Sequence, residues 1–131
     1  MNFSFEKLEV WQKSEDLAVE TYKLLPKFPP FEQYALCYQI RKAVTSVSFN
    51  IAEGSGRTSY KEKMRFLEIS FGSLRETYSQ LHLAVRLGYI SQIDDFEPLL
   101  PYFFEIEKKL NGLKWFYQKQ MDSESESQSN Q

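Results

Sequence analysis

The chain has 131 residues, of which 42% are hydrophobic and 16% aromatic, and its net charge at pH 7 is −2. This length fits a single domain with its own core, and no apolar run is long enough to span a membrane. The N-terminus lacks a basic segment followed by an apolar run, and a single cysteine excludes an internal disulfide, so we expect a cytoplasmic protein without a signal peptide.

Apolar residues recur at helical spacing in four segments, and the first of these covers residues 6–25. Pro26 ends this segment, since proline has no amide hydrogen to donate and restricts the residue before it. The expected seam consists of Trp11, Ser14, Ala18, Thr21 and Leu25, flanked by Val10, Leu17 and Leu24.

The second helix is expected to begin near Phe31 or Glu32. Gly54 and Gly56 should close it, because glycine readily takes the left-handed conformation of a helix C-cap. Its apolar face carries Leu36, Ile40, Val44, Val47 and Ile51.

The third helix has a clear start, since the sequence SYKE at residues 59–62 is a capping box. In such a box the Ser59 hydroxyl accepts from a free backbone amide and Glu62 reaches back to the cap. Gly88 should end the helix. The stripe consists of Met64, Leu67, Phe71, Leu74, Tyr78, Leu81 and Val85.

The fourth helix should start between Ser91 and Asp95, with Pro98 and Pro101 bending its first turns. Its stripe of Leu99, Phe103, Ile106, Leu110, Leu113 and Tyr117 alternates spacings of four and three, as in the seam of a near-parallel bundle. Residues 122–131, DSESESQSNQ, have nothing apolar to bury and should form a disordered acidic tail.

Four amphipathic helices with short connections predict an all-α, up-down-up-down four-helix bundle over residues 1–121. The second and third helices also carry apolar residues opposite their core stripes: Tyr38, Phe49, Ile69, Leu83 and Leu87. Scattered surface apolar residues are normal. We interpret two such clustered faces, with the aromatic surplus, as a candidate homo-oligomer interface.

One flank of the second helix carries polar residues beside the apolar stripe. Asn is a poor helix former, and a carboxylate near a helix C-terminus faces the negative end of the macrodipole. Because the following turn is short, the free amides that begin the third helix should satisfy Asn50 or Glu53, with Glu53 and Arg57 also spaced for an ion pair. We interpret this set as a structural corner rather than a ligand site: Ser46, Asn50, Glu53, Gly54, Gly56, Arg57, Ser59 and Glu62.

Residues 39–91, QIRKAVTSVSFNIAEGSGRTSYKEKMRFLEISFGSLRETYSQLHLAVRLGYIS, closely resemble the four-helix bundle family of 23S ribosomal RNA intervening-sequence proteins. The opening FEKLEVWQKSEDLAVETYKL and the later LNGL resemble the family's first and last helices, and NIAEGSGR is its specific core. The resemblance implies a bacterial protein that assembles as a ring-like homopentamer and has no established biochemical activity. A related branch, the accessory variability proteins of diversity-generating retroelements, binds nucleic acid and a reverse transcriptase. Those proteins are strongly basic, and the acidic balance of this chain argues against a reverse-transcriptase partner.

The charge distribution is uneven, because residues 41–86 carry eight Lys or Arg and four acids and include all five arginines. A solvated mixed-charge surface is the common interpretation. The alternative is a basic face that binds RNA or DNA weakly and non-specifically through Arg57, Lys61, Arg65, Arg75 and Arg86.

Catalysis finds no support in the sequence. His82 is the only histidine and Cys37 the only cysteine, so neither has a companion at metal-ligand spacing, and we expect no catalytic residue, metal or cofactor. We therefore expect a non-enzymatic homo-oligomer of uncertain role, acting as a nucleic-acid adaptor or, as the alternative, as a protein-binding scaffold. No membrane partner is expected.

Overall fold

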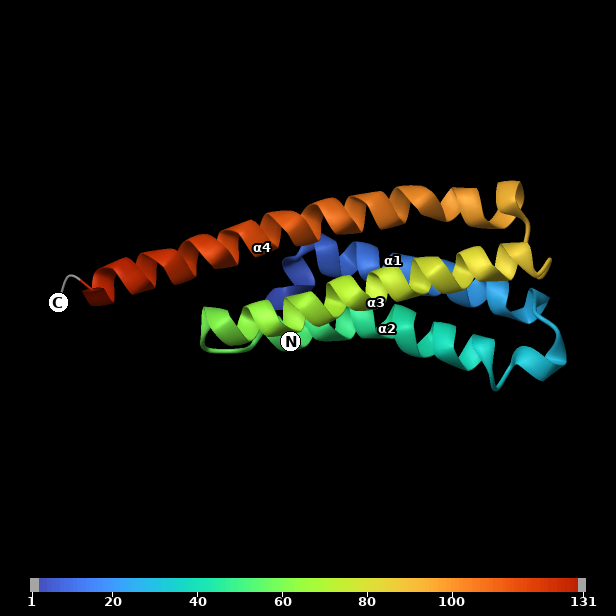
Figure 1. Cartoon of the computed structure of the whole chain (residues 1–131), viewed down its shortest axis with the longest axis horizontal. Coiled ribbons are helices and arrows are strands. Elements are labelled where there is room, and N and C mark those ends of the chain that lie inside the picture. The colour runs from blue at the N-terminus through green and yellow to red at the C-terminus, as the bar shows by residue number, and fades with distance from the viewer. Residues whose placement is uncertain (1–2, 130–131) are drawn as a thin grey trace.

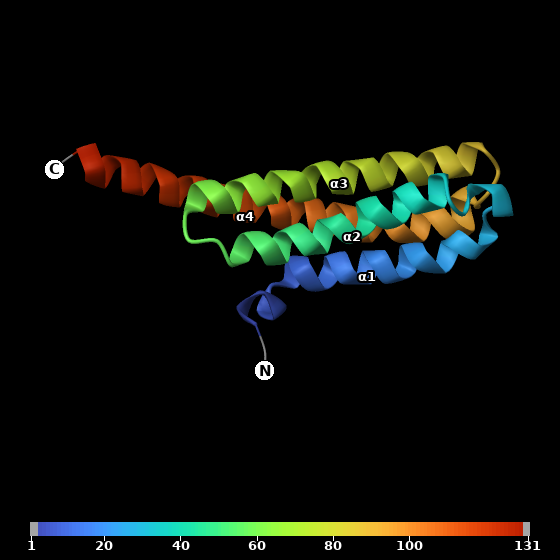
Figure 2. The same cartoon turned by 90° about the horizontal axis from the view of Figure 1, so that it is seen from below.

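The computed structural model describes residues 3–129, which form four long helices and no strand. These are α1 (Glu9–Leu24), α2 (Leu36–Ser55), α3 (Tyr60–Arg86) and α4 (Leu100–Ser129). Successive helices run in opposite directions, and α1 also packs against α4, which closes the bundle (Figures 1 and 2). The predicted all-α four-helix architecture is therefore confirmed. None of the helices among residues 3–129 combines the length and the apolar character needed to cross a membrane.

Short turns of helix connect the long ones. A 3₁₀ turn at Ser4–Lys7 precedes α1, so this helix begins three residues later than expected. Two more 3₁₀ turns, Leu25–Lys27 and Pro30–Glu32, occupy the proline-rich link, and α2 begins only after them, at Leu36. Prolines favour these tight turns because their ring fixes φ and removes an amide donor.

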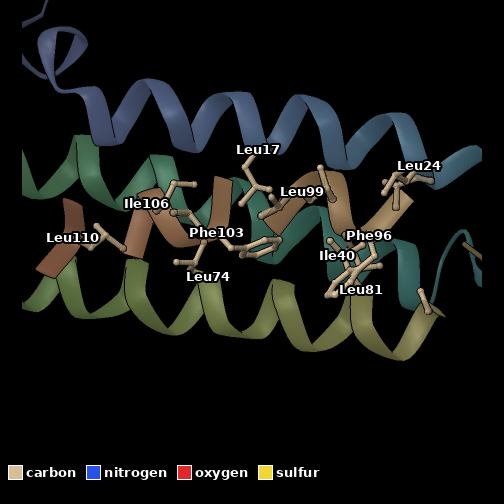
Figure 3. Close-up of a cluster of buried hydrophobic side chains, with 14 of the residues drawn as sticks. Leu17, Leu24, Ile40, Leu74, Leu81, Phe96, Leu99, Phe103, Ile106 and Leu110 are labelled. Atoms are coloured by element: carbon tan, nitrogen blue, oxygen red, sulfur yellow. The ribbon is translucent and has the colours of Figure 1, made fainter. Parts of the chain in front are cut away.

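The core lies where the four predicted stripes meet, and Figure 3 shows its central side chains. Leu17, Ile40, Leu81, Ile106 and Leu110 are completely buried. Each such side chain stabilises the fold by about 1.5–3 kcal/mol relative to exposure. On α1 the buried face is rotated slightly from the predicted seam, and consists of Val10, Ser14, Leu17, Thr21 and Leu24.

The end of the bundle that carries the α3–α4 link is closed by a buried carboxylate. Ser91 Oγ accepts from the Asp94 amide (3.1 Å), and the Ser91 amide donates to Asp95 Oδ2 (2.7 Å). Asp95 Oδ1 also accepts from Lys27 Nζ at 2.5 Å, which joins this link to the one between α1 and α2. A π-helical turn at Gln92–Phe96 and a 3₁₀ turn at Glu97–Leu99 follow.

The prolines of this region act before α4 rather than within it. Pro98 lies in the 3₁₀ turn, and Pro101 is the second residue of α4, where no intrahelical amide bond is lost. The predicted stripe from Leu99 to Tyr117 faces the core, with only Leu113 partly exposed.

The C-terminal segment differs from the disordered tail expected at residues 122–131. In the structure α4 continues to Ser129 and extends beyond the other helices (Figure 1). No glycine or proline interrupts this segment, and Gln118 Nε2 donates to Asp122 Oδ1 (3.0 Å) one turn along. Residues 122–129 are nonetheless fully on the surface, and residues 130–131 lie outside the described part of the chain.

Replacing Asp95 tests the closure of this end of the bundle. Burial alone would raise the pKa of Asp95, but the Lys27 ammonium and the Ser91 amide lower it, and the net pKa lies below the usual 3.8. A carboxyl with a lowered native pKa stabilises the fold above its unfolded pKa, and this contribution is lost as pH falls through the native pKa. Asp95→Asn should therefore lower the unfolding free energy by on the order of 1 kcal/mol at pH 7.

Urea denaturation at pH 7 and pH 3 measures this difference. The gap between wild type and Asp95→Asn should shrink at pH 3, whereas Asp94→Asn, at the exposed neighbouring carboxyl, should change little at either pH. If the difference in unfolding free energy between wild type and Asp95→Asn were equal at both pH values, the ionised Asp95 carboxylate would not be the stabilising group.

Candidate functional site

The predicted corner residues extend from the middle of α2, at Ser46, to the first turn of α3, at Glu62, and small polar side chains link the two helices. Asn50 Nδ2 donates to the Ser46 carbonyl (2.8 Å) and to Ser46 Oγ (2.9 Å). Ser46 Oγ also accepts from Ser73 Oγ of α3 at 2.8 Å. The expectation that amides at the start of α3 donate to Asn50 or Glu53 was wrong: Asn50 Nδ2 donates one turn back to Ser46, and Glu53 accepts from Arg57.

The charged members of the corner pair locally. Arg57 Nη2 donates to Glu53 Oε2 at 3.0 Å, which confirms the predicted i,i+4 pair. Ser59 Oγ accepts from the Glu62 amide (3.1 Å), so the cap that starts α3 is confirmed, but the Glu62 carboxylate accepts from Arg65 Nε instead of completing the box.

Gly56 closes α2 as predicted, although not in the left-handed conformation, and Gly54 has a different role. Gly56 caps α2 with φ −88°, and the only positive φ among residues 3–129 is that of Gly88, at 80°. Gly54 is a buried helical residue, where an added Cβ would lie 3.0 Å from Phe66 Cβ and 3.4 Å from the Lys63 carbonyl. Gly54 is therefore required for close approach of α2 to α3 rather than for a left-handed cap.

Two side chains missed in the sequence complete the corner. Lys63 Nζ donates to the Ser55 carbonyl at 2.8 Å and so satisfies a free acceptor at the end of α2. The guanidinium carbons of Arg57 and Arg65 each lie 4.6 Å from the centre of the Phe66 ring, within cation–π range. The only sequence signal for this arrangement was the adjacency of Arg65 and Phe66.

The candidate nucleic-acid residues on α3 occupy one side of that helix. At 100° per residue, Lys61, Arg65, Arg75 and Arg86 fall on the side opposite the buried residues Ser70, Leu74, Thr77 and Leu81. Their line is about 37 Å long at 1.5 Å per residue. They therefore face away from the core, although Glu62, Glu68 and Glu76 share the helix.

Three of the five candidate cations are already paired with carboxylates. Arg57 and Arg65 pair within one helical turn, and Arg75 Nη2 lies 3.3 Å from Glu107 Oε1 on α4. These arginine side chains are 45% to 73% exposed, so each pair contributes little and can exchange its carboxylate for another anion. Lys61 and Arg86 form no ion pair within residues 3–129.

The candidate oligomer interface is exposed on this single chain. Tyr38 and Phe49 on α2, Ile69 and Leu83 on α3, and Leu87 directly after α3 expose 41% to 62% of their surface. Phe104 and Trp115 on α4 are each 64% exposed and were not singled out from the sequence. Both belong to the side of α4 opposite its core stripe, so helical periodicity was a usable signal for them.

The sequence contains one cysteine, Cys37, and one histidine, His82, and the structure gives them different environments. No cluster of three or more His, Cys, Asp or Glu side chains that could hold a metal ion occurs in the described residues. Cys37 is buried, and burial raises the pKa of its thiol, so it stays protonated at neutral pH. His82 is exposed and packs edge-on against Phe96 at 6.1 Å.

Comparison with known proteins agrees with the bundle. The model of one protein family, described as the 23S rRNA-intervening sequence protein, matches residues 6–112. A crystal structure of a protein with unknown function from the S23 ribosomal protein family of Bacteroides thetaiotaomicron is similar, with a TM-score of 0.70 and 28% identity. The alignment covers 80% of this chain and 97% of that one. A search of curated proteins found no match.

Two glycine substitutions test the close approach at the corner. Gly54→Val places a branched side chain against Phe66 and should lower the unfolding free energy by about 1–3 kcal/mol. Gly72→Ala in α3, where an added Cβ meets nothing within 4 Å, should instead raise it by about 0.5–1 kcal/mol. Urea denaturation followed by circular dichroism measures the unfolding free energy of both variants. An unchanged unfolding free energy for Gly54→Val would show that α2 and α3 can move apart without destabilising the fold.

Proposed function

This chain belongs to the 23S rRNA-intervening sequence protein family, and we propose that it is a non-enzymatic homo-oligomer that binds RNA or DNA weakly and without sequence preference. The observation that carries the proposal is the outward line of Lys61, Arg65, Arg75 and Arg86 along α3. Arginine presents a planar fork of donors that matches phosphate. Contacts to phosphate alone give affinity without sequence readout.

The oligomer follows from apolar faces on two different helices. A contact between the outer face of α2 on one copy and that of α3 on the next is heterologous, and such contacts form a ring when the rotation between copies closes on itself. We propose a ring-like homopentamer built through Tyr38, Phe49, Ile69, Leu83 and Leu87. The ring repeats the basic line of α3 on every copy, which raises the effective affinity for one nucleic-acid strand.

A protein-binding scaffold is the second candidate function. It is favoured by exposed aromatic side chains beyond the proposed interface, such as Tyr34 at 93% and Trp115 at 64% exposure. Aromatic anchors of this kind are enriched at protein–protein contacts. This reading predicts a protein partner and no affinity for nucleic acid.

The oligomer is tested by size-exclusion chromatography with light scattering. Wild type at micromolar concentration should give about five times the 15.5 kDa subunit mass. Phe49→Glu and Leu83→Glu should each shift the mass towards the monomer, because a buried unpaired charge opposes the contact. Val19→Glu, on the outer side of α1 at 56% exposure, is the matched control and should leave the mass unchanged. A wild-type mass of 15.5 kDa would refute the proposal.

Nucleic-acid binding is tested by salt titration of a labelled RNA oligonucleotide. Wild type should bind at about 50 mM salt and release the RNA as salt rises. Arg65→Glu/Arg75→Glu should abolish binding, whereas Lys7→Glu/Lys108→Glu, with the same change of net charge on other elements, should retain most of it. Removing residues 122–131 deletes three acids and should strengthen binding. No binding by any of the proteins at low salt would leave the scaffold as the better account.

A further inference from the structure

A groove runs along the outer side of the bundle between α3 and α4. It consists of two adjoining hollows of about 250 and 300 Å³ that share Arg75. Tyr78, Phe104 and Glu107 line the first hollow. Phe71, Gly72, Asn111 and Lys114 line the second, together with Glu68.

The groove is open at Gly72, which contributes no side chain to its α3 wall. An added Cβ at Gly72 would meet nothing within 4 Å, so the glycine leaves a gap in the wall. Two ion pairs between residues of the described chain bridge the opening: Arg75 with Glu107 at 3.3 Å, and Lys114 with Glu68 at 3.9 Å. All four side chains are 43% to 73% exposed, and exposed pairs of this geometry contribute little to stability.

The groove combines accessible aromatic rings with two cations, each of which is paired with an exposed carboxylate. The Arg75 guanidinium carbon lies 6.0 Å and Lys114 Nζ 5.8 Å from the centre of the Phe71 ring. Phe104 is 64% and Tyr78 38% exposed, although both are large apolar side chains that a bundle could have buried. Asn111 adds an exposed amide with donor and acceptor capacity.

We infer that this α3–α4 groove binds single-stranded nucleic acid. Bases stack on Phe104 and Tyr78, while Arg75 and Lys114 exchange their glutamates for phosphate oxygens. Proteins that bind single strands without sequence preference pair a cationic track with aromatic platforms in this way. The inference rests on the proposed nucleic-acid binding and narrows it from any nucleic acid to unpaired strands.

The aromatic rings decide between a single strand and a duplex. In a duplex the base faces are stacked on one another, so Phe104 and Tyr78 have no free base to contact. A duplex can contact only the cations, through its phosphates, and gains nothing from the rings. The predicted signature is therefore a preference for single strands that depends on the aromatic groups.

The experiment measures fluorescence anisotropy of a labelled RNA of mixed sequence, about 25 nucleotides long and without internal pairing, alone and annealed to its complement, at about 50 mM salt. Wild type should bind the single strands more tightly than the duplex. Phe104→Ala should weaken single-strand binding about fivefold or more, the loss of one base stack, and leave duplex binding unchanged. Phe31→Ala removes an even more exposed phenylalanine (74%) from the α1–α2 link and should have no effect.

A second variant blocks the groove without harming the fold. Gly72→Leu places a side chain in the open wall, and leucine is a better helix former than glycine, so the bundle should be at least as stable as wild type. It should weaken single-strand binding to the same degree as Phe104→Ala, with an unchanged or raised denaturation midpoint.

The outcomes separate this inference from the proposal on which it rests. If Phe104→Ala and Gly72→Leu bind single strands like wild type while Arg65→Glu/Arg75→Glu does not, nucleic-acid binding stands and the groove inference is overturned. Equal wild-type affinity for single strands and duplex also overturns it. If wild type binds no RNA, the proposed nucleic-acid binding and the groove inference are both refuted. The exposed rings then belong to a protein-binding surface.

Discussion

The close packing of α2 against α3 is the constraint on which the rest of the molecule depends. Gly54 has no room for a Cβ beside Phe66, Ser70 Oγ donates to the Val47 carbonyl at 2.9 Å, and the two helices meet again through the Ser46 and Ser73 hydroxyls. Small residues allow this approach because they keep the helix axes near each other. Helices α2 and α3 therefore form one rigid unit, in which the basic side of α3 and the apolar outer sides of both helices keep fixed relative positions.

The contact between α3 and α4 is built differently, and this difference produces the groove. Aromatic rings replace the small residues: Tyr78 packs edge-on against both Phe96 and Phe103, at 5.3 Å in each case. Large rings hold the helices apart, and the exposed ion pair between Arg75 and Glu107 spans the opening without filling it. The same α3 therefore has a tight side towards α2 and an accessible side towards α4.

The buried polar groups of the interior are satisfied within the fold, with the Thr21 hydroxyl as an exception among the described residues. The buried hydroxyls of Ser14 and Thr77 donate to carbonyls one turn back, which satisfies them without a ligand. Asp95 is buried, but its oxygens are taken by Lys27 and the Ser91 amide. The outward charges and aromatic rings are positioned on the long helices of the bundle.

The sequence by itself determined the features that depend on neighbours within a few residues: four helices, their core stripes, the Ser59 cap and the Glu53–Arg57 pair. Each is set by helical periodicity, which links positions three and four apart. Only the tertiary structure decided how distant segments meet. The partner of Ser46 lies 27 residues away and that of Arg75 lies 32 away, and the need for Gly54 appears only when Phe66 is placed opposite it. Residues 122–129 contain no apolar side chain that could be buried, and this was evident from their composition. Their helical state follows from the backbone hydrogen bonds that continue α4 to Ser129.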